Sequence, residues 1–428
     1  MGSRALDATH RALDATHTVE PNKAASVPAA PKESPFPLAV PAAPAAPADV
    51  APATPADATP AAPAAATPLP HRRSRGLDVL RGLIVGWLLV VVYTPTTGLR
   101  GHAAWFGWDH SDVFFPMFVL VAGMGLAMQT RRGMPWGRLL RRFVTLLALG
   151  LLVNAWLGAG PDVSQLRYTG VLQRIALAGL AGAVIVAVLR RHWAAVSAAA
   201  LAVALGWGVA LSLASAGCPG GLPTPAGCGT FVDVELALFG ADHAYARGTL
   251  GHDPEGLVST AGALATFLAG YAAAALLTRL SSRRAGVRSA ALLALASGWA
   301  AAWPLFLLLQ PVAKRLWTPS FLAVHAALGI ALLALAVLVF DSDRPAWLVR
   351  MLEVVSWPLV ALGRNALVLW IGVFVLGKVL VTTVGPDGTP LEVSLLADYG
   401  AAGFFALTAG GWLLLASAMH ACRWYVRL

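Results

Sequence analysis

The chain has 428 residues, of which 57% are hydrophobic and only 12% are charged, and its formal net charge is +10 at pH 7. A soluble domain is usually about a quarter charged, so this composition excludes an ordinary soluble protein and predicts an integral membrane protein. The positive charge does not indicate a nucleic-acid-binding protein, because the basic residues form short clusters between apolar runs and lack the interleaved aromatic residues of a nucleic-acid surface.

The first 70 residues differ from the rest of the chain. They contain a perfect tandem repeat, RALDATH at 4–10 and again at 11–17, followed by a long Ala/Pro tract. A tract without an apolar period cannot bury enough surface to offset the entropy of ordering it, so residues 1–70 are predicted to be a disordered tail. No short apolar segment follows a basic start, which indicates that there is no cleavable signal peptide and that the first span acts as the insertion signal.

Residues 71–428 are predicted to form one all-α transmembrane domain, a polytopic helical bundle of about ten spans. About 20 apolar residues are needed to cross a hydrocarbon core of about 30 Å, and runs of this length recur between polar breakers. Pro358, Arg364 and Asn365 interrupt the ninth run. The expected spans are 77–95, 111–129, 139–157, 170–189, 193–215, 257–280, 288–310, 320–340, 359–381 and 396–420.

The distribution of basic residues predicts the orientation of the spans. One set of alternate connecting segments carries 18 Arg residues, whereas the other set carries five basic residues: Arg100, Arg167, Arg247, Lys314 and Arg315. Cytoplasmic segments carry the excess, so both termini are expected in the cytoplasm and segments 96–110 and 216–256 outside. The preference for Arg and Ala is typical of a GC-rich bacterial genome. The expected location is therefore the bacterial plasma (inner) membrane.

Two of the three cysteines, Cys218 and Cys228, lie in the largest outside segment, 216–256. Thiols there face an oxidising compartment, so the sequence is compatible with a disulfide between them and also with two free thiols. The third cysteine, Cys422, falls on the cytoplasmic side and is expected to be unpaired.

Polar side chains at the outer ends of the spans form the first candidate site. Ionisable groups at membrane depth are costly and are usually kept for function or for pairing. The loop between the first two spans carries His102, and Asp112 begins the second span. The other members of this outer group lie where the fourth, sixth and eighth spans begin: Gln173, Arg174, Asp253, Glu255, Lys314 and Trp317.

A second group lies at the inner ends. Asp78 and Arg81 are at the cytoplasmic end of the first span, and Arg364 and Asn365 lie within the ninth. A basic stripe opens the third span, at Arg138, Arg141 and Arg142. This stripe fits the positive-inside signal as well as it fits a phosphate site.

Most of these residues also have a purely structural interpretation. Asp112 and Asp253 are favourable residues at the start of a helix. Asp78 and Arg81, three positions apart, are spaced to neutralise each other. Arg174 is the hardest to explain in this way, because a charge inside a span needs a partner or a cavity.

His102 has the chemistry of a general base, because an imidazole takes and returns a proton near neutral pH. A carboxylate such as Asp112 could fix its tautomer, and Trp105 and Trp108 offer flat apolar surface for a sugar ring or an acyl thioester. His110 is the competing base. The inner cations suit the phosphates of a CoA nucleotide, and a donor on one side with a base on the other implies transfer across the membrane.

Several short motifs follow one another along residues 75–428. They are RGLDVLRG at 75–82, HAAWFGW at 102–108, DVFFPMF at 112–118, GVLQR at 170–174, DPEG at 253–256, KRLWTPSF at 314–321 and GRN at 363–365. In this order they resemble the motifs of the heparan-α-glucosaminide N-acetyltransferase family and its bacterial relatives.

The resemblance implies a transmembrane acyltransferase that takes an acetyl group from cytosolic acetyl-CoA, with His102 as the catalytic histidine. The acceptor would be an amino sugar or a glycan hydroxyl on the extracytoplasmic side. The resemblance also implies a homodimer in contact with membrane lipid, and neither a metal ion nor nucleic acid is expected to take part.

One position departs from the family. Relatives commonly have an asparagine-containing turn before the histidine, and that asparagine is thought to assist catalysis; here the turn is VYTP at 92–95. Tyr93 or Thr94 would have to polarise the thioester carbonyl instead. Two alternatives are therefore kept: a transporter or flippase of an envelope precursor, and a non-catalytic membrane scaffold with the same fold. The lack of an inverted repeat between the chain halves argues against the transporter.

Overall fold

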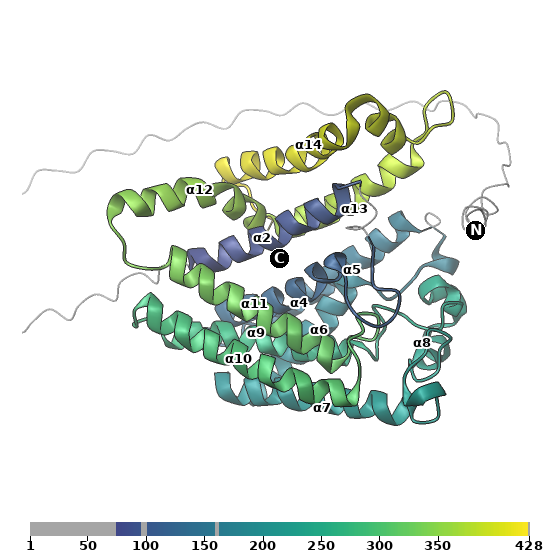
Figure 1. The fold of residues 1–428 in the computed structure, drawn as a ribbon, viewed down its shortest axis with the longest axis horizontal. Helices are drawn as coiled ribbons and strands as arrows, with labels where there is room; N and C mark the ends of the chain where they lie inside the picture. The colour runs from purple at the N-terminus through teal and green to yellow at the C-terminus, as the bar shows by residue number, and fades with distance from the viewer. Residues whose placement is uncertain (1–73, 96–100, 159–161, 427–428) are drawn as a thin grey trace, which may run out of the picture. The chain divides into compact units, whose positions relative to one another are not determined.

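The structure, a computed structural model, describes residues 74–95, 101–158 and 162–426. The predicted disordered tail, residues 1–70, lies outside these described residues. Within them the fold is all-helical, and ten helices are long and apolar enough to cross a membrane, as predicted. The long helices (Figure 1) are α2 (Arg75–Tyr93), α4 (Phe114–Gln129), α5 (Trp136–Leu157), α6 (Val171–Val188), α7 (Trp193–Ser215), α9 (Thr260–Arg279), α10 (Ala285–Leu309), α11 (Pro319–Phe340), α12 (Ala346–Arg364), α13 (Ala366–Thr382) and α14 (Leu391–Ala421).

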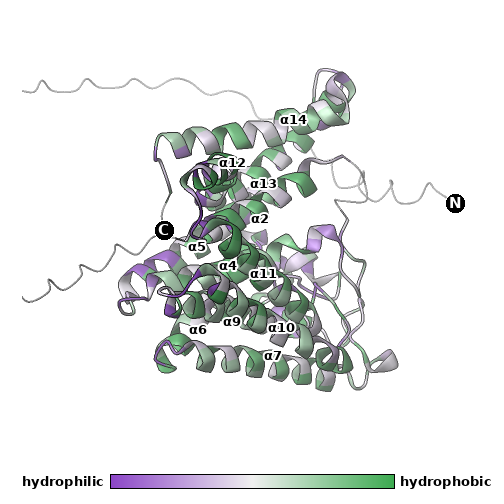
Figure 2. Cartoon of the chain, turned by 60° about the vertical axis from the view of Figure 1, so that its left-hand side comes forward, coloured by the Kyte–Doolittle hydropathy of each residue, from purple (hydrophilic) through white to green (hydrophobic). Residues whose placement is uncertain are grey.

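The apolar runs of the sequence become the helices with small shifts at their ends. The run 193–215 coincides with α7, and the other runs through the eighth begin and end within a few residues of the helices that they predicted. Figure 2 shows hydrophobic residues along most of the helix surfaces, with hydrophilic residues concentrated at helix ends and in connecting segments. This distribution is the one that a surface in contact with lipid requires.

The centre of the bundle is the close crossing of α4 and α9. A Cβ on Gly123 would lie 1.9 Å from the carbonyl oxygen of Phe267, and a Cβ on Gly270 would lie 1.9 Å from that of Leu120. Small residues let membrane helices approach in this way, where packing and not the hydrophobic effect drives association. The crossing fixes the position of α4. Because α4 begins two residues after Asp112, it also fixes the chain at the end of the His102 loop.

α12 covers only the first part of α2. Arg75, the first residue of α2, pairs with Glu353 at 2.8 Å. Near the end of α12, a Cβ on Gly363 would lie 2.3 Å from the carbonyl oxygen of Asp78. The same Cβ would lie 2.7 Å from the nitrogen of Gly82. Since an α-helix has 3.6 residues per turn, α12 ends about two turns into α2.

α13 continues where α12 ends. The hydroxyl of Tyr93, the last residue of α2, donates to the carbonyl of Val373 at 3.3 Å, and Lys378 Nζ donates to the carbonyl of Leu157, the last residue of α5, at 3.1 Å. α12 and α13 therefore form one passage through the bundle, broken at Asn365, where the sequence predicted an interrupted ninth span. Counted in this way, the described helices make ten passages.

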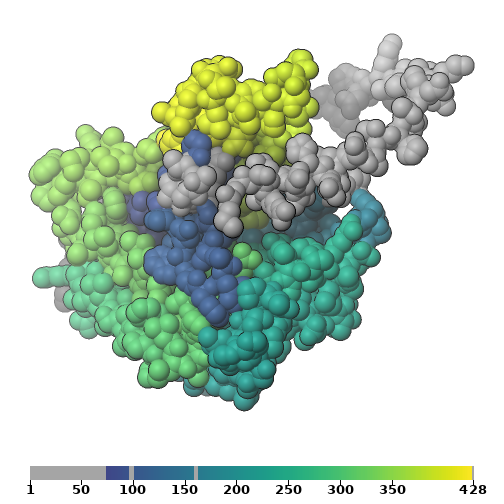
Figure 3. Space-filling view, turned by 45° about the vertical axis from the view of Figure 1, so that its right-hand side comes forward, coloured from purple at the N-terminus to yellow at the C-terminus, as the bar shows by residue number. Residues whose placement is uncertain are grey.

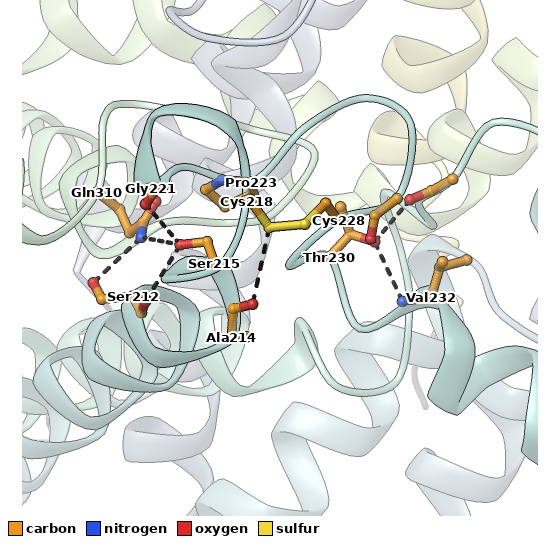
Figure 4. Close-up of a disulfide and its surroundings, with 12 residues drawn as sticks. Ser212, Ala214, Ser215, Cys218, Gly221, Pro223, Cys228, Thr230, Val232 and Gln310 are labelled. Atoms are coloured by element: carbon orange, nitrogen blue, oxygen red, sulfur yellow. Dashed lines mark hydrogen bonds between the residues drawn. A yellow bond between two sulfur atoms is a disulfide. The ribbon is translucent and has the colours of Figure 1, made fainter.

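The segment between α7 and α9 forms a compact cap that contains the short helix α8 (Val232–Phe239). Cys218 and Cys228 are joined by a disulfide, as Figure 4 shows, which settles the two possibilities left by the sequence. Next to the disulfide, the Ser215 hydroxyl donates to the carbonyl of Gly221 at 3.0 Å and accepts from Gln310 Nε2 at 3.4 Å. These bonds attach the cap to the ends of α7 and α10.

Candidate active site

The loop that carries His102 is held by the segment between α10 and α11. The N–H of Gly107 donates to the carbonyl of Val312 at 2.7 Å, and Gly107 pairs with Ala313 in an isolated bridge. Gly107 has a φ of +95°, a conformation that glycine adopts without strain. In Figure 3, blue atoms from the part of the chain that includes this loop reach the surface between green atoms on the left and teal atoms on the right.

His102 and Asp112 are in contact. Nδ1 of His102 is 2.6 Å from Oδ1 of Asp112, while Oδ2 accepts from the N–H groups of Ala103 at 3.1 Å and Asp109 at 2.9 Å. The Asp112 side chain is fully buried, whereas 44% of the His102 side chain is exposed. A carboxylate in this position holds the Nδ1–H tautomer and leaves Nε2 to accept a proton.

Ser111 supports the same tautomer. Its hydroxyl donates to the carbonyl of Gly101, and its oxygen lies 2.7 Å from Nδ1 of His102. Since the hydroxyl proton points to Gly101, the oxygen is a second acceptor for Nδ1–H.

Lys314 brings a cation to the pair. Its Nζ lies 3.2 Å from Oδ1 of Asp112, and it lies 3.0 Å from Nδ1 and 3.3 Å from Nε2 of His102. Burial lowers the pKa of Lys314, although the carboxylates of Asp112 and Glu255 favour its charged form. A cation beside the proposed base can attract a carbonyl oxygen on which negative charge develops.

A cavity of about 280 Å³ lies beside His102. It is bounded by α2, by the start of α4, by α13 and by α14, and its polar side chains are His102, Ser111, Tyr93 and Glu392. The apolar side chains are Val91, Val92, Phe114, Phe374, Leu380, Val381 and Phe404. A predominantly apolar pocket with a few convergent polar groups is the usual form of a small-molecule site.

Tyr93 lines this cavity at the position where relatives have the asparagine turn. Its hydroxyl is engaged, because it donates to the carbonyl of Val373 at 3.3 Å and accepts from Trp412 Nε1 at 2.8 Å. The Tyr93 side chain therefore contributes a fixed wall, and Lys314 is the better-placed group to polarise a carbonyl near His102.

The two tryptophans of the His102 loop face different surroundings. Trp105 is only 8% exposed, and its Nε1 donates to the carbonyl of Pro223 in the cap at 2.9 Å. Trp108 is 49% exposed, with its ring 5.7 Å from that of His325. Trp105 therefore anchors the loop to the cap, and its predicted contact with substrate stays a prediction. Only Trp108 presents a broad exposed face.

Arg167 binds the carboxylates of Asp253 and Glu255. In the sequence, Arg167 indicated only a basic residue of an outside segment. Nη2 of Arg167 lies 2.5 Å from Asp253 and 2.9 Å from Glu255, and the Thr169 hydroxyl donates to Asp253. Burial alone would raise the pKa of Glu255, but Arg167, then Arg174 and Lys314, lower it below its ordinary value. This network joins the loop before α6 to the loop before α9.

Arg174 and Gln173 lie next to this network, inside the first turn of α6. Arg174 is fully buried, with its guanidinium 4.9 Å from the ring of Trp317 and Nη2 donating to Ser259 at 2.5 Å. Among the described residues, Nε and Nη1 of Arg174 and both amide atoms of Gln173 have no hydrogen-bond partner. Trp317 itself is buried and donates to Thr266 at 3.0 Å.

The inner group comes together at the other end of α2. The Asp78 carboxylate lies 3.7 Å from Nη1 of Arg81 and 3.4 Å from Nε of Arg364, whose Nη1 donates to the Tyr425 hydroxyl at 3.2 Å. Asn365, 2% exposed, donates to the carbonyls of Ala361 and Ala416. Since α2 has 19 residues and rises about 1.5 Å per residue, this cluster and the His102 cluster lie at opposite ends of the bundle.

Four residues near these groups carried too little local signal to be chosen from the sequence. Ser111 is in the short 3-10 helix His110–Asp112, and Arg167 is in a loop. Glu392 is in the first turn of α14, and His325 is buried in α11 with Nδ1 2.7 Å from the carbonyl of Phe321. Among these four, only Ser111 had a signal in the sequence, because it directly precedes Asp112. Within the described ranges, no group of three or more His, Cys, Asp or Glu residues could hold a metal ion.

Comparison with protein families gives a match to the model described as "Heparan-alpha-glucosaminide N-acetyltransferase, catalytic", over residues 73–218. The match runs from the start of α2 to the disulfide and includes His102, Asp112 and the Gln173–Arg174 pair. Residues 73–218 are therefore similar to the catalytic part of this family. A search of functionally characterised proteins gave no match.

The match covers about a third of the chain. It confirms the family resemblance found in the sequence motifs, and with ten apolar helices of membrane-spanning length it indicates a multi-pass membrane acetyltransferase. Asp253, Glu255, Lys314, Trp317, Arg364 and Asn365 lie beyond the matched residues. Their link to the family's catalytic part is the contacts described above.

Proposed function

We propose that the protein transfers an acetyl group from cytosolic acetyl-CoA to an amine or hydroxyl of an amino sugar or glycan on the opposite side of the membrane. The observation that carries this proposal is the His102–Asp112 pair, 2.6 Å apart, beside a cavity and within the matched catalytic region. The distribution of Arg residues between the connecting segments supports a position of this end of the bundle outside the cytoplasm. The plasma membrane of a bacterium is the proposed location, and a homodimer the proposed assembly.

Each group of the His102 cluster has a defined part in the proposed reaction. Nε2 of His102 takes the proton from the acceptor as its nitrogen or oxygen attacks the thioester carbon. The C–S bond then breaks, and the proton passes to the departing CoA thiolate. Asp112 stabilises the imidazolium that forms in between, and Lys314 stabilises the oxyanion. At the inner end, Arg81 and Arg364 are the proposed partners of the CoA phosphates.

The test is turnover by the purified full-length protein in lipid nanodiscs, with acetyl-labelled acetyl-CoA and glucosamine. We expect labelled N-acetylglucosamine and an equal amount of free CoA. His102→Ala should reduce the rate by about 10²–10⁴-fold, the usual contribution of a general base, while CoA binding survives because the nucleotide lies at the other end of α2.

Two matched variants complete the experiment. Asp112→Asn keeps the shape of the side chain but presents only one acceptor oxygen, so it should also lower kcat; a mere helix start would tolerate it, because Asn begins helices as well as Asp. His110→Ala tests the competing base. Full turnover by His102→Ala with loss in His110→Ala would transfer the role to His110. Absence of turnover with every amine and alcohol tested, despite CoA binding, would favour the transporter or the scaffold.

A further inference from the structure

A second cavity, of about 530 Å³, lies at the seam between α2, α4 and α11. From α2 it is lined by Leu80, Leu83, Ile84 and Trp87, whose spacing places them on one face of the helix. The remaining lining residues are Trp108, Asp109, His110, Val113, Phe114, Met117 and Leu332. This cavity, called here the seam groove, extends along α2 from near the inner cluster to the His102 end.

The seam groove opens onto the surface of the bundle. Leu83 is 44% exposed and Trp108 is 49% exposed, both on helices or loops of the membrane domain. Its polar groups gather at the outer end only, where Trp87 Nε1 donates to the carbonyl of His110 at 3.0 Å and the His110 ring lies 2.9 Å from the carboxylate of Asp109. Indoles and charged groups at one end with hydrocarbon below them are the arrangement found at a membrane–water boundary.

The outer end of the seam groove adjoins the cavity of His102. Phe114 lines both cavities. His110 lines the groove, and the next residue, Ser111, lines the other cavity and lies 2.7 Å from Nδ1 of His102. A molecule whose chain occupied the groove would therefore have its outer end next to the cavity of His102.

The chemistry of the lining distinguishes the occupants that could fill it. The pantetheine arm of CoA carries two amides, and burying an amide without a hydrogen-bond partner is unfavourable. Between Leu80 and Phe114 the wall offers hydrocarbon side chains from Leu83, Ile84 and Val113 and no polar side chain below Trp87. A hydrocarbon chain needs no such partner and gains by burial.

We propose that the seam groove binds the hydrocarbon chain of a lipid-anchored acceptor, so that the protein acetylates the amino-sugar head group of a membrane lipid. This inference rests on the proposed function and specifies its acceptor class. The chain lies between α2 and α4, the head group reaches over Asp109 and His110, and the acceptor nitrogen enters the cavity of His102. The Asp109 carboxylate is placed to attract an ammonium group on the arriving head group.

The test compares two acceptors, glucosamine and dodecyl glucosaminide, in nanodiscs of phosphatidylcholine with acetyl-CoA as donor. Leu83→Trp fills the groove. It should raise the KM for dodecyl glucosaminide by about tenfold or more, the loss expected when two methylenes lose their burial, and so remove that acceptor's advantage over glucosamine. The control is Leu205→Trp on α7, which is 51% exposed but not part of the groove and should leave both KM values unchanged.

A binding measurement makes the result independent of turnover. A dodecyl glucosaminide with a photoreactive diazirine at the chain end should crosslink to α2 between Leu80 and Trp87 in the wild type and much less in Leu83→Trp, as mapped by mass spectrometry. If glucosamine is acetylated but the diazirine labels helices outside the groove, the groove inference is wrong and the proposed function stands. If the diazirine labels the groove but neither acceptor is acetylated, the groove binds the hydrocarbon chain and the proposed function is wrong.

Two further results would also overturn the inference. A rise in the KM for acetyl-CoA in Leu83→Trp, with the acceptor values unchanged, would assign the groove to the pantetheine arm. The mass of the detergent-solubilised Leu83→Trp particle, measured by light scattering, could also differ from that of the wild type while the crosslinking is unchanged. That result would assign the groove to a contact between two copies of the chain.

Discussion

At the scale of single residues, the unusual feature is a largely buried ammonium beside a carboxylate and an imidazole. Lys314 Nζ lies 3.2 Å from Asp112 and 3.3 Å from Nε2 of His102, and burial lowers the pKa of Lys314. A cation in this position lies where negative charge would develop on a carbonyl oxygen beside His102. The Asp112 carboxylate, in contact with Nδ1, holds the tautomer of the imidazole.

The first prediction at this scale concerns the pH dependence of the reaction. Burial lowers the pKa of Lys314 below its ordinary value, so Lys314 loses its charge as the pH rises, at a lower pH than an exposed lysine does. The fall of kcat at high pH that follows from this loss should move to higher pH in Lys314→Arg, because a guanidinium stays charged there. Lys314→Gln has no charge at any pH, and its kcat should be lower by about 10²-fold because an oxyanion partner is missing. A fall of kcat at the same high pH in the wild type and in Lys314→Arg would show that Lys314 is not the titrating group.

Part of this cluster was accessible from the sequence. His102 and Asp112 are ten residues apart on either side of a short loop, so their approach could be predicted from local chain geometry. The contact of Lys314 with His102 spans 212 positions and depends on the bridge from Gly107 to Ala313. Glu392 comes to the cavity through α14. Sequence spacing holds no information about such neighbours, because the packing of distant helices creates them.

At the scale of elements, the break between α12 and α13 shapes the inner cluster. The helix stops at Arg364, and Asn365 donates its side-chain amide to the carbonyls of Ala361 and Ala416, binding the broken end to α14. Helix breaks at membrane depth occur where side chains satisfy the freed backbone groups. The break turns the Arg364 guanidinium toward Asp78 and Tyr425, at the end of the bundle proposed to face acetyl-CoA.

A second prediction belongs to this element. Arg364→Ala should weaken CoA binding by about 10–100-fold, the range for a lost hydrogen bond to a charged group, as measured by isothermal titration calorimetry of the purified protein. The control, Arg350→Ala, removes an exposed arginine from the same helix and should bind CoA normally. Unchanged CoA binding together with a lower Tm in Arg364→Ala would make Arg364 a structural partner of Asp78.

The elements themselves were largely predictable, because apolar runs of bilayer length fix where helices cross. The interruption of the ninth run was also visible, at Pro358, Arg364 and Asn365. The start of α12 was not, since residues 346–358 continue an amphipathic helix before the apolar run becomes continuous. A hydropathy criterion has no way to separate such a helix from the passage that follows it.

At the scale of the whole molecule, the charge asymmetry of the connecting segments predicts the orientation of the bundle and, with it, the direction of the proposed transfer. Asp242→Cys lies in the cap and Ser282→Cys between α9 and α10, and both positions are exposed. With Cys422 replaced by serine, an impermeant maleimide added to intact cells should label Asp242→Cys and leave Ser282→Cys unlabelled until lysis. The opposite pattern would invert the membrane orientation and place the His102 cavity on the donor side.

The disulfide in the cap has a consequence for when the enzyme becomes complete. The ring closed by Cys218 and Cys228 contains Pro223, whose carbonyl binds the indole of Trp105, three positions after His102. In the proposed orientation this ring closes only after the cap has crossed the membrane and met an oxidant. In a newly made chain, the disulfide that holds Pro223 against Trp105 therefore forms late, after the cap has crossed the membrane. We therefore expect the proposed acetyl transfer to begin only in molecules whose cap has reached the outside of the membrane.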